Sequence, residues 1–137
     1  MKVKEVYETV TKGAEVVRED DDIPTLIAKV SRDPASRAVF VVNEQEELVG
    51  IISVRDLLRV VGARYLHRET TTVISYLTAQ KASDIMQPPA SVSPEDDIEE
   101  ALRLAVTHDL KDIPVVEGGK VVGDLNCFEI LLNIKLE

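Results

Sequence analysis

The sequence contains two related halves, and this internal repeat constrains the fold more than any other feature. Residues 14–30 resemble residues 90–106, and residues 37–58 resemble residues 111–132. The offset between matching positions changes by only a few residues along the chain, as short insertions in loops would cause. The pattern predicts two copies of one unit of about 55 residues. One copy of that size buries too little surface to be stable alone, so we expect the copies to pack together.

Each copy is predicted to follow the order strand, helix, strand, strand, helix. In the second copy, Ser93 and Pro94 are typical of a helix start, with acidic residues in the first turn and an apolar stripe behind them. Gly118 and Gly119 predict a hairpin turn between two apolar strands, and Asn126 opens a last helix. The expected segments are a strand near Glu15–Arg18, a helix from about Ile23 to Ser31, strands Val39–Asn43 and Leu48–Ile52, a helix from Ser53, an extended Ala90–Val92, and strands Ile113–Glu117 and Val121–Leu125.

The predicted fold class is α/β (α+β), with two β-α-β-β-α repeats packed sheet to sheet about a pseudo-twofold axis. We expect the first repeat to cover residues 1–62, a connector to cover 63–82, and the second repeat to cover 83–137. The connector is neither rich in glycine and serine nor charged in a block, and it carries several apolar residues. It is therefore predicted to be packed and partly helical rather than a flexible linker.

The charge of the chain limits what it can bind. Lysine and arginine number 16 and aspartate and glutamate 25, which gives a net charge of −9. Such a chain repels a phosphate backbone, so we expect no nucleic-acid partner. Residues 1–80 carry 11 basic and 13 acidic side chains, a net of −2, and residues 81–137 carry 5 and 12, a net of −7. An anionic ligand should therefore prefer the first half.

Apolar stretches and cysteine use predict the location of the protein. No stretch approaches the ~20 apolar residues that a membrane span needs, and the first residues lack the apolar core of a secretory signal. The single cysteine, Cys127, fits a reducing compartment. We expect a cytoplasmic protein with no membrane partner.

Two short motifs at corresponding strand–helix junctions carry the candidate chemistry. They are Ser53-x-x-Asp56 in the first copy and Asn126-x-x-Glu129 in the second. Either motif alone is typical of a capping box, in which the side chains satisfy backbone N–H groups at a helix start. The chain has no P-loop, Gly-x-Ser-x-Gly or His-Glu-x-x-His motif, and only two histidines. We therefore expect neither an enzyme nor a metal site.

The repeat and these junctions together resemble a known family. The pairing of residues 50–56 with residues 123–129, the Asp84-Ile85-Met86 segment and the Ile113-Pro114-Val115-Val116 strand entry are similar to cystathionine-β-synthase (CBS) domains. A tandem pair of these is called a Bateman module, and the resemblance covers nearly the whole chain apart from the connector. It implies a homodimer that acts on an unknown regulated protein. It also implies no cofactor, but a regulatory adenosine ligand in the cleft between the repeats: AMP, ADP, ATP or S-adenosylmethionine, with AMP or ATP favoured.

The resemblance also assigns roles to residues. The family signature is a serine or threonine, two residues, and an aspartate, so Asp56 would accept hydrogen bonds from the ribose hydroxyls and Ser53 would help to hold phosphate. The first site is expected to comprise Arg37, Val39, Phe40, Ser53, Arg55 and Asp56. In the second copy Asn126 and Glu129 depart from the signature, so a weaker or empty second cleft is expected. Its residues would be Met86, Lys111, Ile113, Asn126 and Glu129.

Two functions of different classes remain open from the sequence. The first is a regulatory module that senses an adenosine nucleotide. The alternative is a ligand-free dimerisation or adaptor module whose clefts are filled by side chains such as Phe40, which stands where the second copy has Pro114. In either case the predicted dimer surface consists of apolar residues at helical spacing: Leu57, Leu58, Val61, Leu131 and Leu132.

Overall fold

The computed structural model describes residues 1–10, 16–32, 37–66 and 74–136. The chain divides into two compact units, and each of them collects segments from distant parts of the sequence. The first-repeat unit consists of residues 15–43 and 49–88, and the second-repeat unit consists of residues 1–14, 44–48 and 89–137.

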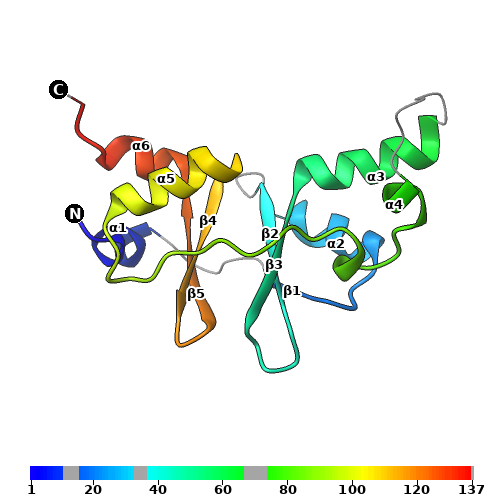
Figure 1. The fold of residues 1–137 in the computed structure, drawn as a ribbon, viewed down its shortest axis with the longest axis horizontal. Helices are drawn as coiled ribbons and strands as arrows, with labels where there is room; N and C mark the ends of the chain where they lie inside the picture. The colour runs from blue at the N-terminus through cyan, green and yellow to red at the C-terminus, as the bar shows by residue number, and fades with distance from the viewer. Residues whose placement is uncertain (11–15, 33–36, 67–73, 137) are drawn as a thin grey trace. The chain divides into compact units, whose positions relative to one another are not determined.

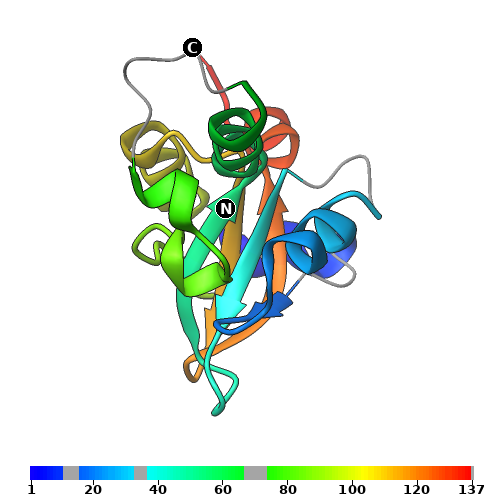
Figure 2. The same cartoon turned by 90° about the vertical axis from the view of Figure 1, so that its right-hand side faces the viewer.

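The first-repeat unit is built on a sheet with the strand order β1-β2-β3. These strands are β1 (Val16–Arg18), β2 (Ala38–Val42) and β3 (Leu48–Ser53). β1 runs parallel to β2, with Val17 opposite Val41. The helical segments are α2 (Ile23–Val30), α3 (Val54–Leu66), α4 (Ile74–Thr78) and the 3₁₀ turn η1 (Ala82–Asp84). Figure 1 and Figure 2 both show α2 beside the strands.

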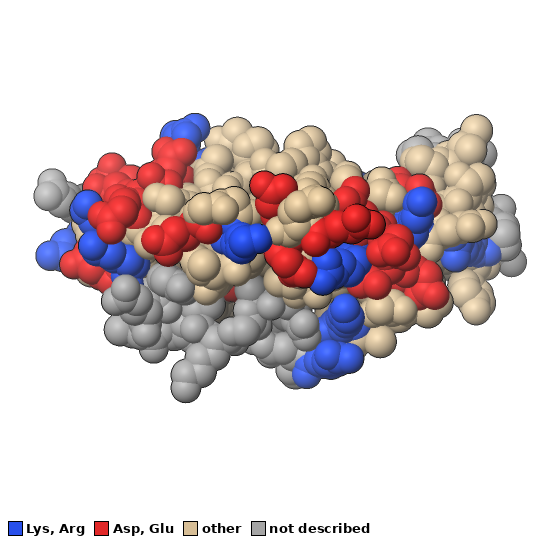
Figure 3. All heavy atoms as spheres, turned by 90° about the horizontal axis from the view of Figure 1, so that it is seen from below, with Lys and Arg blue, Asp and Glu red and all other residues tan. Residues whose placement is uncertain are grey.

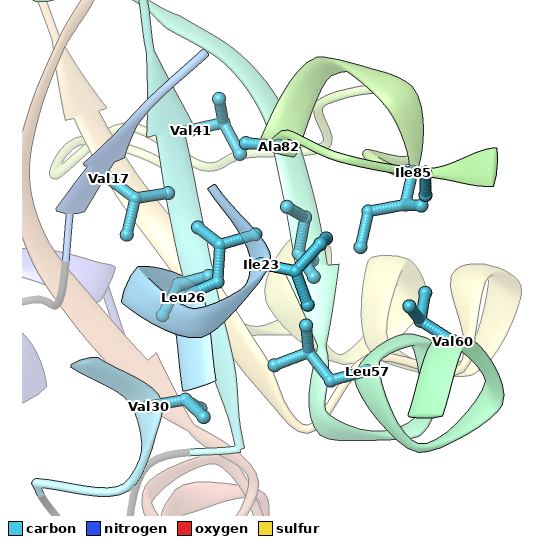
Figure 4. Close-up of a cluster of buried hydrophobic side chains, with 12 residues drawn as sticks. Val17, Ile23, Leu26, Val30, Val41, Leu57, Val60, Ala82 and Ile85 are labelled. Atoms are coloured by element: carbon cyan, nitrogen blue, oxygen red, sulfur yellow. The ribbon is translucent and has the colours of Figure 1, made fainter. Parts of the chain in front are cut away.

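The core of this unit lies between the sheet and its helices. Ile23, Leu26 and Val30 recur at helical spacing, so all three point from one face of α2 into the core. Figure 4 shows them converging with side chains from β1, β2, α3 and η1. Because Val39 and Val41 face this core, strand alternation turns Ala38 and Phe40 to the other face of β2.

Within its described residues, the second-repeat unit contains a two-stranded ribbon and three helices. Its elements are α1 (Val3–Val10), α5 (Ile98–His108), β4 (Asp112–Glu117), β5 (Lys120–Asn126) and α6 (Cys127–Asn133). β4 and β5 are antiparallel, and Gly118 and Gly119 turn between them with φ of 59° and 81°. Positive φ at both positions favours glycine, which explains the hairpin predicted there. The core is formed by Val3, Val6, Val92, Ile98, Ala101, Ile113, Val115, Leu125 and Ile130.

α1 was not predicted from the sequence, and it packs in the second-repeat unit. The Val3 N–H donates to the carbonyl of Asp96 at 2.8 Å, and the Lys4 N–H donates to the carbonyl of Pro94 at 2.9 Å. These carbonyls satisfy N–H groups that the first turn of a helix leaves without partners. The ammonium groups of Lys2 and Lys4 also pair with the exposed Glu95 carboxylate. The beginning of the chain is thereby joined to the segment before α5.

The predicted start of the fifth helix was wrong by four residues. Ser93 and Pro94 do not open α5; they form a turn in which the Ser93 N–H donates to Asp96 Oδ2 at 2.8 Å and the Asp96 N–H donates to the Ser93 carbonyl at 3.1 Å. The helix begins at Ile98, where the apolar stripe starts. The first repeat has the same turn, since the Arg18 N–H donates to Asp21 Oδ2 at 2.9 Å. In the second repeat the local side-chain bond of Asp96 thus delays the helix beyond its predicted start.

The connector contains α4 and the end of α3. Of the apolar side chains expected to pack, Tyr76 packs against the core of the first-repeat unit, whereas Tyr65, Leu66, Ile74 and Leu77 are exposed. Val73, which was also expected to pack, lies outside the described residues. The expectation of a packed connector therefore holds for Tyr76 and fails for the other four.

The surface charge and the length of the helices can be compared with the expectation of neither a nucleic-acid nor a membrane partner. In the view of Figure 3, acidic side chains cover more of the face than basic ones, in line with the net charge of −9. None of the helices in the described residues is long and apolar enough to cross a membrane.

Candidate functional site

The first junction lies where β3 passes into α3. Asp56 Oδ2 accepts hydrogen bonds from the Ser53 N–H and from the Ser53 hydroxyl, both at 3.0 Å. In return the Asp56 N–H donates to Ser53 Oγ at 3.2 Å. The aspartate is 5% exposed although it lies in the first turn of the helix. The motif therefore folds as the capping box that its sequence predicts, and both Ser53 donors reach the Oδ2 atom of Asp56.

Gly50 allows close packing near the first junction. A Cβ atom on Gly50 would lie 2.6 Å from Met86 Sδ and 2.8 Å from Met86 Cβ. Only a residue without a side chain lets the segment after η1 approach β3 so closely. This approach is held by two backbone bonds between Ile51 and Gln87, at 3.1 and 2.8 Å.

The second junction repeats this bond pattern where β5 passes into α6. The Glu129 N–H donates to Asn126 Oδ1 at 3.0 Å, and the Asn126 N–H reaches Glu129 Oε1 at 3.5 Å. A further backbone bond recurs in both repeats, from Val54 N–H to the Arg37 carbonyl at 3.0 Å and from Cys127 N–H to the Lys111 carbonyl at 2.7 Å. The two junctions are thus equivalent in backbone hydrogen bonding and in their position within the repeat, although their residues differ.

The carboxyl groups of the two junctions differ in how well they are satisfied. Glu129 is 9% exposed, and its Oε2 atom is buried without a hydrogen bond. Burial raises the pKa of Glu129, the Asn126 N–H lowers it, and the nearby charge of Asp112 raises it further. The longer side chain of Glu129 meets the Asn126 N–H only at 3.5 Å, through Oε1, and its Oε2 atom has no donor.

The structure brings some of the predicted site residues together and separates others. Arg37 and Arg55 are exposed at the two ends of the first junction, and Lys111 is exposed before β4. Val39 and Ile113 were expected to line the clefts, but strand alternation places both in the hydrophobic cores.

Phe40 and Met86 also have defined positions. Phe40 is 1% exposed, on the face of β2 away from the core. Met86 was grouped with the second cleft, but it packs against the core of the first-repeat unit and against Gly50. The contacts therefore associate Met86 with the first junction.

Sequence reasoning missed Asp112 and Asp124. Asp112 is 3% exposed and lies opposite Asn126 in the ribbon, while Asp124 lies opposite Pro114. The signal was available, since both are charged residues inside apolar strands. Among the described residues, no group of three or more histidine, cysteine, aspartate or glutamate side chains is arranged to hold a metal ion.

Comparison with known proteins identifies the repeat. The family model of the CBS domain matches residues 3–63 and again residues 82–135. The chain belongs to the CBS domain family. The predicted tandem pair and the α+β fold are thereby confirmed.

Known CBS domain structures share this fold. A CBS domain-containing protein from Thermotoga maritima superposes with a TM-score of 0.84 at 38% identity, covering 96% of this chain and 92% of that one. CBSX2, solved in complex with AMP, superposes with a TM-score of 0.74 at 22% identity, covering 96% and 93% of the two chains. An uncharacterized protein of Methanopyrus kandleri is 33% identical over 107 residues, which is 77% of this chain. The chain spans only 50% of the length of that relative.

Proposed function

We propose that this CBS pair is a regulatory module that binds an adenosine nucleotide at the Ser53–Asp56 junction. The observation that carries the proposal is the fixed carboxylate of Asp56 at the start of α3. Its Oδ2 atom is held by Ser53, and we propose that Oδ1 accepts a charge-assisted hydrogen bond from a ribose hydroxyl.

The surroundings of this junction suit a phosphate. The N-terminus of the 13-residue helix α3 favours negative charge. The exposed Arg37 and Arg55 flank the junction and supply positive charge. CBS domains are generally regulatory, and CBSX2, which shares the fold, has been solved with AMP. These facts support AMP or ATP as the ligand and a regulatory rather than catalytic role.

The output of the module is proposed to be a homodimer that acts on a regulated protein in the cytoplasm. α3 exposes Leu58 and Val61, and α6 exposes Leu131 and Leu132. Leu57, which was expected on the same surface, is buried in the core instead. Exposed leucines on neighbouring turns are typical of an interaction surface. Sedimentation should give the mass of a dimer, and Leu58→Glu should shift the equilibrium toward the monomer.

Thermal unfolding tests the nucleotide proposal. The protein is heated with AMP, ADP, ATP, S-adenosylmethionine or no ligand. A ligand at 100 times its dissociation constant adds about 2.7 kcal/mol, or roughly 10 °C in a domain of this size. We expect a shift with at least one of these compounds that disappears in Asp56→Ala and persists in Glu129→Ala. A shift that survives Asp56→Ala would contradict the assigned site.

A ligand-free adaptor is the second candidate. It is favoured by Phe40, which fills space on its own face of β2, and by the capping box, which is satisfied without a ligand. Absence of a shift with all four compounds, together with a stable dimer, would support this adaptor in place of the sensor.

A further inference from the structure

Two helices of the chain expose apolar stripes. On α3, Leu58, Val61 and Tyr65 follow one another at helical spacing, so they lie on one side of the helix, and all three are exposed. On α6, Leu131 and Leu132 are exposed as well. Exposed apolar side chains that gather on one side of a helix mark a surface for another protein.

The apolar stripe on α3 has a positively charged border. The basic residues of this helix are Arg55, Arg59 and Arg64, and each is at least partly exposed. The single acidic residue of the helix, Asp56, is buried and bonded to Ser53. Contact between the α3 helices of two copies would therefore bring arginines together with no exposed carboxylate of α3 between them. Such like-charge contacts are unfavourable.

The surroundings of α6 carry the opposite charge. The one charged residue within α6, Glu129, is buried. α5 packs beside α6 (Figure 1); its Glu99 is exposed, and its Glu100 pairs with Arg103. Over the whole sequence, the second-repeat unit holds 7 basic and 16 acidic residues, a net charge of −9, whereas the first-repeat unit holds 9 of each. Two second-repeat units in contact would therefore repel each other.

We propose that two copies of this chain bind head to tail, with α3 of one copy packed against α6 of the other. The inference rests on the proposed function for the existence of a dimer, and it adds which surfaces meet. Under a twofold axis the contact forms twice, because each copy supplies one α3 and one α6. Each contact joins two apolar stripes and sets the arginines of α3 against an acidic unit. A dimer of α3 on α3 and α6 on α6 would join the same stripes but place like charges together.

Disulfide trapping tests which helices meet. In a Cys127→Ser background, one cysteine is placed on α3, as Leu58→Cys or Val61→Cys, or on α6, as Leu131→Cys or Leu132→Cys. Two cysteines form a disulfide only when their Cα atoms come within about 7 Å of each other. Each variant alone should stay uncross-linked under mild oxidation. After subunit exchange, a mixture of an α3 variant with an α6 variant should give a disulfide-linked dimer in at least one of the four pairings.

Removal of one charge gives an independent readout. Arg59→Gln takes a positive charge from the border of the α3 stripe and keeps a residue that favours helix. In the head-to-tail dimer it should raise the dimer Kd about three- to tenfold, because both contacts lose an attraction of the strength of a surface ion pair. In the alternative dimer it would lower the Kd, since it relieves repulsion between arginines. Lys81→Gln is the matched control: it removes the same charge from the same unit outside α3 and should leave the Kd unchanged. Sedimentation equilibrium measures all three values.

The outcomes separate this inference from the proposed function. A cross-link in any single variant, no cross-link in all four mixtures, or an unchanged or lower Kd in Arg59→Gln would overturn the head-to-tail arrangement. The proposed dimer and its nucleotide site would then still stand. Sedimentation as a monomer at every concentration tested would overturn the proposed dimer and the inference with it. Thermal unfolding with AMP reports on the nucleotide site separately in each case.

Discussion

The two strand–helix junctions are built alike, yet they bury different amounts of charge. Ser53 and Asp56 satisfy each other with three bonds of 3.0–3.2 Å. Asn126 and Glu129 make the same cap with one bond at 3.0 Å and one at 3.5 Å. The comparison shows that a repeat can keep its backbone geometry while its side chains change the chemistry of the site. The predictions below test that difference in order of expected effect.

The largest expected effect is on nucleotide affinity. Asp56→Ala should weaken AMP binding about 10- to 100-fold, since losing one hydrogen bond to a charged group removes about 1.5–3 kcal/mol. Glu129→Ala should leave AMP affinity unchanged. Isothermal titration calorimetry measures both. Equal losses in the two variants would mean that the junctions are equivalent sites.

The next effect concerns the packing of the first junction. Gly50→Ala should destabilise the protein by about 1–3 kcal/mol, because the new methyl group overlaps Met86. Gly62→Ala is the matched control within α3. Its nearest neighbour would be Leu66 Cδ1 at 3.9 Å, so it should stabilise the helix by about 0.5–1 kcal/mol. Urea unfolding gives both values, and a neutral Gly50→Ala would show that Met86 moves aside freely.

The caps themselves should differ in strength. Ser53→Ala should cost about 2 kcal/mol, because it removes the cap of the Asp56 N–H and also a donor to a buried carboxylate. Asn126→Ala should cost about 1 kcal/mol, since it removes only the acceptor of the Glu129 N–H. Free energies of unfolding in urea test the order. A larger loss in Asn126→Ala would show that the second cap is the stronger one.

The smallest effect depends on pH. The folded state raises the pKa of Glu129, so it holds that proton more tightly than the unfolded state does. The glutamate therefore lowers stability as pH rises through its folded pKa, and it costs nothing below the unfolded value of about 4.3. Glu129→Gln should raise the unfolding midpoint at pH 7 and lose that advantage near pH 4. An advantage that is constant over this range would mean that the carboxyl is not desolvated.

Most strands and helices could be predicted from the sequence, because the elements expected in one repeat could be checked against those of the other. Asn126 was correctly predicted to cap the last helix. Gly118 and Gly119 were correctly predicted to form the turn of the hairpin before it. The start of α5 was missed because Asp96 closes a turn before the helix begins. In the sequence, a motif that caps a helix looks the same as one that closes such a turn. Helix boundaries depend on this competition between turns and helix starts, and the residue types alone do not decide it.

The candidate site was predictable in part. The Ser53–Asp56 cap follows from a motif of four residues, so the sequence was sufficient to find it. Val39 was misplaced because the core face of β2 depends on tertiary packing. Asp112 could have been noticed as a charged residue inside an apolar strand, but its burial beside Glu129 is a property of the fold that the sequence does not give.

The position of α1 has a consequence for the order of folding. α1 is translated before the rest of the described chain, but the carbonyls that cap it belong to Pro94 and Asp96. Its partners therefore do not exist until most of the protein has been made. A nascent chain must carry this amphipathic segment unpaired through the synthesis of the whole first repeat. Closing a loop of that length is slow compared with local contacts, so docking of α1 should be among the last steps of folding.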